Sequence, residues 1–197
     1  MKNEIIQWFH RFSEEGVAQV QYNLGFMYFY GQNVSQDYQA AFHWYKEAAE
    51  QGIIQAQYNI GFMYFHGYGV LQDYLQAFTW YKRAAEQNDE SAQVAIANMY
   101  EDGIGVPQNF MEAIRWYQKA AEQGNSIAQK ALGFLYQKSQ NVCEAYKWLR
   151  LSILQDSDKK AVETLESLIQ RMTQREINEG QQRFKSFKFN LDIDYNN

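Results

Sequence analysis

The chain has 197 residues, of which 46% are apolar and 17% aromatic, so it has enough apolar side chains to form a buried core. Its net charge is −5, and its Lys and Arg residues are interspersed among Asp and Glu, without the basic stripe that a nucleic-acid backbone requires. The single cysteine excludes an intramolecular disulfide, and no apolar run is long enough to span a membrane. The first residues do not form a secretory signal, so we expect a soluble, cytoplasmic protein.

An internal repeat of 36 residues is the strongest pattern in the chain, and it predicts a solenoid. The motif is best preserved in the second copy, where it reads in order Ile60-Gly61, Tyr64, Gly67, Gly69-Val70, Ala77, Trp80-Tyr81 and Ala84-Ala85. All five tryptophans occupy one slot of the repeat: Trp8, Trp44, Trp80, Trp116 and Trp148. Eleven of the twelve glycines also occupy repeat slots, and Gly180 is the exception.

These landmarks divide the chain into consecutive segments of a single solenoid domain. Residues 1–16 are half a repeat, and full repeats follow at residues 17–52, 53–88 and 89–124. Residues 125–156 form a fourth repeat, which is shortened because Trp148 arrives four residues early. Residues 157–197 are interpreted as a C-terminal helical cap and tail, because a solenoid must cover its last apolar face.

Each full repeat is predicted to contain two helices. In the first repeat, Val20, Leu24 and Met27 have the spacing of one apolar helical face. Gly31 follows where the helix should end in a left-handed conformation, which glycine adopts without steric penalty. Gly69 of the second repeat is replaced by Asn33 in the first, and asparagine is the other residue type that tolerates positive φ.

Capping residues mark where the other helices begin. Asp37, Asp73 and Asn109 each precede a second helix, where their side chains can accept hydrogen bonds from free backbone amides. Asp158 is predicted to cap a later helix in the same way. Thr173 and Glu176 have the spacing of a capping box for a last helix that reaches about Phe187, with residues 189–197 as a loosely docked tail.

The repeat resembles the Sel-1-like repeat family, relatives of the tetratricopeptide repeats, over about residues 5–154. The resemblance implies an all-α fold, a right-handed α/α superhelical solenoid of about four 36-residue helix-turn-helix repeats with helical caps. It also implies a concave surface lined by the first helix of each repeat, and a role as an adaptor or scaffold. The family shares no catalytic residues, so none is carried over. Some bacterial relatives carry a disulfide in each repeat, and this chain lacks the cysteines for one.

No arrangement of residues indicates catalysis, a metal site or a cofactor. His10, His43 and His66 fall in different slots of the repeat, so we interpret them as surface histidines. Cys143 is placed in the shortened loop of the fourth repeat and is interpreted as an unreactive thiol. The Gly-x-Gly-Val loops follow helices rather than strands and lack a P-loop lysine, which argues against phosphate binding. The chain is therefore predicted not to be an enzyme.

Alignment with tetratricopeptide repeats predicts which residues of the first helices face a partner. The predicted partner-binding residues are Tyr22, Phe26, Phe29, Tyr58, Phe62, Phe65, Asn98, Glu101 and Asp102. Val94 is assigned to the same groove. Partly exposed aromatic rings are typical binding anchors, although the same rings could instead fill the space between repeats.

These patterns predict a protein-interaction module that binds a protein or peptide partner on its concave face. We expect an apolar or aromatic partner segment near the first two repeats, with a basic group against Glu101 and Asp102. The alternative is an inhibitor or immunity-type protein that neutralises a bacterial toxin or enzyme. The uncovered first half repeat could pair with another chain, so we expect a monomer or a weak homo-oligomer.

Overall fold

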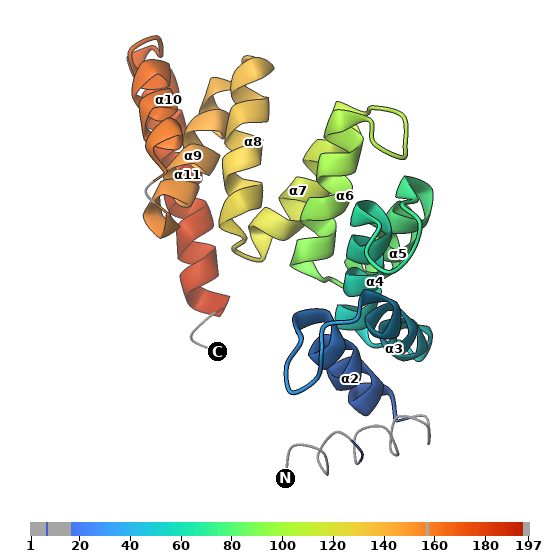
Figure 1. The fold of residues 1–197 in the computed structure, drawn as a ribbon. Coiled ribbons are helices and arrows are strands. Elements are labelled where there is room, and N and C mark those ends of the chain that lie inside the picture. Colours follow the sequence, from blue (N-terminus) through green and yellow to red (C-terminus); the bar gives the residue numbers. More distant parts are fainter. Residues whose placement is uncertain (1–6, 8–16, 157, 195–197) are drawn as a thin grey trace. The chain divides into compact units, whose positions relative to one another are not determined.

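The computed structural model describes residue 7, residues 17–156 and residues 158–194, with side chains to residue 188 (Figure 1). The predicted half repeat at residues 1–16, with Trp8 and His10, lies outside the described residues apart from Gln7. Over the described ranges the regular structure is entirely α-helical. The helices are α2 (Ala18–Tyr30), α3 (Tyr38–Glu50), α4 (Ile54–His66), α5 (Tyr74–Glu86), α6 (Glu90–Asp102), α7 (Phe110–Glu122), α8 (Ser126–Lys138), α9 (Val142–Gln155), α10 (Lys159–Ile169) and α11 (Gln174–Asp194).

The chain forms two compact units, Met1–Ala113 and Ile114–Asn197, and their boundary falls within α7. In the first unit each helix from α2 to α5 packs against the next one along the chain. In the second unit α8, α10 and α11 all pack against α9 (Figure 1). The predicted all-α solenoid of helix-turn-helix repeats is confirmed.

The loops between paired helices have the predicted left-handed residues. Gly31 ends α2 with φ of 68°, and Asn33 has φ of 63° at the slot where Gly69 has φ of 68°. At Gly69 a second constraint excludes a side chain, because a Cβ atom would lie 2.1 Å from the backbone oxygen of Tyr38. The loop of one repeat is therefore held directly against the start of the preceding repeat's second helix.

The predicted helix caps are also present. Asp37 Oδ1 accepts hydrogen bonds from the backbone amides of Gln39 and Ala40 at 2.9 and 3.0 Å. Asp73 and Asn109 make the equivalent bonds ahead of α5 and α7. Each such cap is worth about 1 kcal/mol, so the start of every second helix in the full repeats is fixed by its own sequence.

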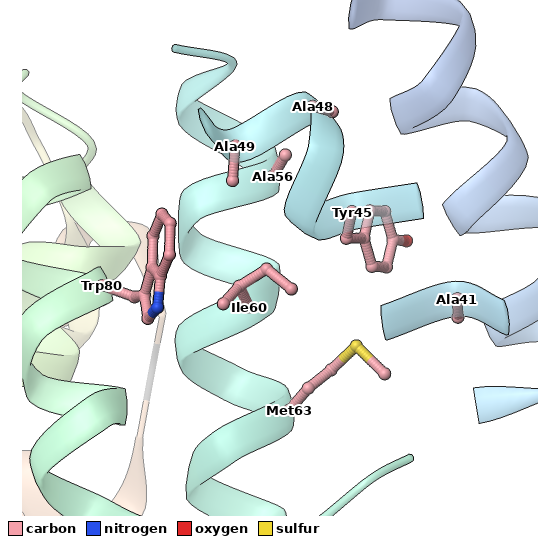
Figure 2. Close-up of a cluster of buried hydrophobic side chains, with 8 residues drawn as sticks. All are labelled: Ala41, Tyr45, Ala48, Ala49, Ala56, Ile60, Met63 and Trp80. Atoms are coloured by element: carbon pink, nitrogen blue, oxygen red, sulfur yellow. The ribbon is translucent and has the colours of Figure 1, made fainter. Parts of the chain in front are cut away.

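Small and aromatic residues of the repeat form the core of the first unit. Figure 2 shows part of this core, with the indole of Trp80 beside the side of α4 that carries Ile60. Gly61 lets α4 approach α5 closely, because a Cβ atom there would lie 2.7 Å from the buried ring of Tyr81. Trp80 is only 7% exposed, whereas Trp44 at the same slot is half-buried.

A series of buried glutamines also follows the 36-residue period, although the apolar pattern of the repeat did not predict it. Gln57, Gln93 and Gln129 are buried, and each donates a 3.2 Å hydrogen bond from Nε2 to an alanine carbonyl oxygen eight residues earlier. Gln87 Nε2 in turn donates to Gln57 Oε1 at 2.7 Å. These bonds give a second donor to carbonyl groups in the last turn of the second helices, each of which also accepts a backbone amide from the following turn. In the sequence these glutamines recur at a constant spacing of 36 residues, but the apolar pattern that predicts helix faces does not include polar residues.

In the second unit, α10 and α11 cover an apolar face of α9. Tyr146, Leu149 and Leu165 belong to the buried cluster between these helices. Gly180, the glycine outside the repeat slots, lies where a Cβ atom would be 2.9 Å from the Tyr146 ring, so it permits close approach of α11. The repeat motif therefore does not account for this glycine, but helix packing does.

The C-terminal caps form as predicted, whereas two placements were wrong. Asp158 Oδ1 accepts from the Ala161 amide at 2.9 Å, and Thr173 N donates to Glu176 Oε2 at 2.8 Å. The last helix continues to Asp194, past the predicted end, because no proline or glycine follows Gly180 to stop it. Cys143 lies in the first turn of α9 rather than in a loop, because α9 already begins at Val142.

Candidate protein-interaction face

The partly exposed aromatic residues of the first unit lie on its first helices, α2 and α4. We call the set Tyr22, Phe26, Phe29, Tyr58, Phe62 and Phe65 the aromatic face. Each of the six is half-buried, so the rings are neither wholly in the core nor fully in water. Aromatic side chains in this state offer a large apolar area that a partner can bury at little further cost in side-chain entropy.

Ring contacts connect the two repeats within this face. Phe29 of α2 and Phe62 of α4 have centroids 6.2 Å apart, and Tyr68 lies 6.0 and 5.9 Å from these two rings. Tyr68 also stacks on Tyr38, with centroids 4.9 Å apart and planes at 22°. Tyr68 is not among the predicted partner-binding residues, because the other repeats carry Gln32 and Ile104 at its slot and the period gives no aromatic signal there.

The first of two small hollows lies between α2 and α4 and has a volume of about 160 Å³. It is called the apolar hollow here and is lined by Phe29, Tyr30, Tyr45, Tyr58, Asn59 and Phe62. Asn59 is the one residue of the lining that is polar and not aromatic, and its side chain lies near those of Tyr22 and Tyr45. The lining therefore presents mainly aromatic surface.

The second hollow lies between α4 and α6 and has a volume of about 210 Å³. It is called the acidic hollow; it shares Tyr58 and Phe62 with the apolar hollow and adds, among others, Phe65, His66, Asn98 and Asp102. The two hollows are repeats of one feature, since Phe29, Tyr30 and Tyr45 lie 36 residues before Phe65, His66 and Tyr81. The chemistry differs because Phe62 of the first hollow corresponds to Asn98 in the second.

Three tyrosines of these hollows are uncharged hydrogen-bonding groups. Burial raises the pKa of Tyr45 and of Tyr81 far above the ordinary value for a phenol. Burial also raises the pKa of Tyr58, and the nearby charge of Asp89 raises it further. None of these phenols can therefore act as a base or supply a negative charge near neutral pH.

The carboxylates set the electrostatic character of the first unit. Residues 17–113 contain ten Asp and Glu residues against three Lys and Arg residues. The three cations, Lys46, Lys82 and Arg83, all lie on α3 and α5, and the sequences of α2, α4 and α6 contain none. The aromatic face and its hollows therefore favour a neutral or positively charged ligand.

The predicted partner-binding residues do not all lie at the hollows. Asn98 and Asp102 are exposed and line the acidic hollow. Tyr22 and Phe26 pack against the core cluster of the first unit instead, and Phe26 contacts Tyr30 with centroids 4.5 Å apart. Glu101 is half-buried, and neither hollow includes it.

One groove assignment was wrong. Val94, which we had placed on the groove, is 8% exposed and belongs to the core. The apolar side chain of Val94 is withdrawn from water, whereas the polar amide of Asn98, about one turn further along the same helix, stays exposed.

Reactive groups in the described part of the chain are dispersed. No group of three or more His, Cys, Asp and Glu residues there is arranged to hold a metal ion. Burial raises the pKa of the Cys143 thiol, and the charge of Glu179 raises it further, which leaves little thiolate for nucleophilic chemistry. No helix in the described ranges is both long enough and apolar enough to cross a membrane.

The repeat, the fold and this face together define a helical-repeat protein of the Sel1 class. Residues 18–53, 54–89, 90–125 and 126–157 each match the Sel1 repeat, which accounts for well over half of the chain. The chain belongs to the Sel1 repeat family. Proteins of this family are in general non-catalytic scaffolds that bind other proteins.

Solved structures with the same fold come from several bacteria. A Sel1 repeat protein from Oxalobacter formigenes has a TM-score of 0.71 and 31% identity, over 77% of this chain and 63% of that one. A protective antigen of uropathogenic Escherichia coli has a TM-score of 0.67 and 28% identity, over 96% of this chain and 50% of that one. This chain thus spans less than two thirds of the length of either protein.

More distant structures share the fold alone. An immunity protein from Pseudomonas aeruginosa has a TM-score of 0.52 and 20% identity, over 95% of this chain and 72% of that one. No curated protein sequence matches this chain significantly.

Proposed function

We propose that the chain is an adaptor that binds a peptide segment of a partner protein across the aromatic face. The observation that carries the proposal is the pair of equivalent hollows, one repeat apart, which share a wall formed by Tyr58 and Phe62. A feature repeated with the solenoid suits a ligand that is itself a chain and can place successive side chains in successive hollows.

The size of the hollows supports a peptide rather than a cofactor or a small-molecule substrate. Sites for such ligands typically measure about 300–1,000 Å³ and enclose most of the ligand. The hollows here measure about 160 and 210 Å³ and open at the surface. Each is of a size for one side chain of a partner, and the half-buried rings around it can serve as anchors.

The alternative function is an inhibitor or immunity-type protein that neutralises a bacterial toxin or enzyme. It is favoured by the shared fold of the Pseudomonas aeruginosa immunity protein, although that likeness extends to the fold alone. Both functions would use the same face, and they differ in what is bound. An adaptor recognises a segment of chain, whereas an inhibitor blocks the catalytic surface of a folded enzyme.

The substitution Phe62→Ala tests the proposal, because Phe62 lines both hollows. Phe42→Ala is the matched control: Phe42 is also half-buried, but it lies on α3 and contacts Tyr64 with centroids 5.2 Å apart. Cross-linking capture from the native cell, read by mass spectrometry, should retain the same partner with the wild type and with Phe42→Ala.

We expect Phe62→Ala to lose that partner while keeping its helicity. Equal capture by both variants would contradict the proposal. A captured toxin or enzyme whose activity falls on binding would favour the inhibitor function instead.

A further inference from the structure

We infer that the bound segment presents two different side chains, an apolar or aromatic one to the apolar hollow and an arginine to the acidic hollow. This inference rests on the proposed function, because it specifies the partner of the same face. It follows from the chemical differences between two hollows that the repeat makes equivalent in position.

The apolar hollow provides no group that could compensate a charge. Phe29, Tyr30 and Phe62 supply rings to its lining. Asn59 contributes only an uncharged amide, which lies near the phenols of Tyr22 and Tyr45. Burying a charged side chain there would leave it without an opposite charge, which is costly, whereas an apolar side chain would pack against the rings. The apolar hollow therefore selects an aliphatic or aromatic side chain.

The acidic hollow combines a carboxylate with aromatic rings. Asp102 lines it together with Phe65, Tyr58 and the amide of Asn98. A cation is attracted to ring faces as well as to a carboxylate. A planar guanidinium can stack on a ring while it donates to carboxylate and amide oxygens, which a lysine ammonium cannot do as well. The acidic hollow therefore selects arginine in preference to lysine.

The position of Asp102 in its helix supports a binding role. Asp102 is the last residue of α6, with Glu101 before it, and no basic residue lies in that turn. Negative charge at a helix C-terminus is unfavourable, because the helix dipole is itself negative there. The corresponding last residues of α2 and α4 are Tyr30 and His66. A residue that destabilises its own helix, as Asp102 does, is expected at a binding site, where its charge serves the ligand.

The spacing of the hollows limits the spacing of the two side chains. The hollows lie on either side of α4, which supplies Tyr58 and Phe62 to both, so their centres are separated by about the width of one helix with its side chains, roughly 10 Å. In a polyproline II segment, residues three apart face the same side and are about 9 Å apart. We therefore expect the arginine three positions from the apolar residue.

Selection from a displayed library of random 12-residue peptides tests the inference with the purified full chain. The wild type should enrich peptides that pair an aromatic or large aliphatic residue with an arginine three positions away. Asp102→Asn should keep the apolar preference, lose the basic one, and bind a wild-type-selected peptide about tenfold more weakly. Asp102→Arg should select an acidic residue at the position of the arginine.

Glu90→Gln is the matched control, because it removes the same charge from the exposed first turn of the same helix. It should select the same peptides as the wild type and bind them with unchanged affinity. Without peptide, Asp102→Asn should melt at a slightly higher temperature than the wild type, because it removes the unfavourable charge.

The outcomes separate this inference from the proposed function. If no peptide is enriched over a library control, or if Phe62→Ala enriches the same peptides, the proposed function is wrong as well. If peptides are enriched through Phe62 but carry no basic residue, only the assignment of the acidic hollow fails. Enrichment of arginine that persists in Asp102→Asn would also overturn that assignment.

Discussion

The two units of the molecule are built on the same repeat but end in different surfaces. Gln57 and Gln129 make the same 3.2 Å bond to an alanine carbonyl oxygen in the first and second unit. Gly61 and Gly133 each let a first helix lie close to the second helix of the same repeat. Gly61 contacts Tyr81, 20 residues later, and Gly133 contacts Leu149, 16 residues later. The buried slots of the repeat are therefore interchangeable between the units.

The surfaces of the two units differ in both cover and charge. The first unit leaves the aromatic face half-buried and is strongly acidic. In the second unit α10 and α11 cover α9, and residues 114–197 carry thirteen Lys and Arg residues against ten Asp and Glu residues. The repeated residues therefore specify the core of each unit, and the residues between them specify what each unit can bind.

The tryptophan slot should give the largest effect. Trp80→Ala in the first unit and Trp148→Ala in the second should each lower the free energy of unfolding by about 3–5 kcal/mol, because each leaves a cavity. Trp44→Ala is the control within the same slot, and its loss should be clearly smaller, since Trp44 is half-buried. Denaturant unfolding followed by circular dichroism measures all three. Equal losses would show that exposure does not distinguish these positions.

The buried glutamines should give an intermediate effect that is the same in both units. Gln57→Leu and Gln129→Leu should each cost about 1–3 kcal/mol, because each removes two hydrogen bonds of a buried side chain. One is donated to an alanine carbonyl oxygen, and the other is accepted from Gln87 or Gln155. Gln19→Leu, at an exposed position of α2, should change stability by less than about 0.5 kcal/mol. A loss in one unit only would break the claim that the buried slots are equivalent.

The smallest effect should come from an ionic contact found in the second unit. Glu144 accepts hydrogen bonds from Lys147 and Arg183, both at 2.7 Å. Burial works to raise the pKa of Glu144, but these two cations together bring it below the ordinary value. The pKa of Glu144 is lower in the folded than in the unfolded chain. The ionised carboxylate therefore stabilises the fold above about pH 4.3, and this stabilisation is lost as the pH falls through the pKa of the folded state.

Hydrogen exchange in α9 and α11 should therefore increase on acidification. Glu144→Gln should remove about 1 kcal/mol or less at neutral pH and flatten this pH dependence. Glu163→Gln, which affects an exposed pair with Lys159, is the control and should leave the pH profile unchanged. A wild-type profile that is equally steep in Glu144→Gln would assign the acid sensitivity to other carboxylates.

Much of the fold was predictable because its signals are local. Asp37 caps the helix that directly follows it, and Gly31 ends the helix that directly precedes it. Such features depend on residues a few positions apart, so their spacing in the chain is enough to identify them. The end of α11 was not predicted, because no proline or glycine follows Gly180 to mark where the helix ends.

The candidate site was only partly predictable. The period singled out Phe29 and Phe62 as partner-binding candidates because the slot of each is repeated, and both line a hollow. It could not show that Tyr68 joins them or that Val94 turns into the core, because these placements depend on contacts with other elements. Ring size and neighbouring helices decide such contacts, and neither follows from spacing.

The sequence by itself determined the repeat, its helix caps and the glycine-containing turns between its helices, because caps, glycines and apolar periodicity act over one or two turns of chain. Only the tertiary structure decided that the equivalent slots of α2, α4 and α6 enclose two hollows of different chemistry. A hollow is the space left between side chains of separate helices, and its volume and lining depend on how those helices pack.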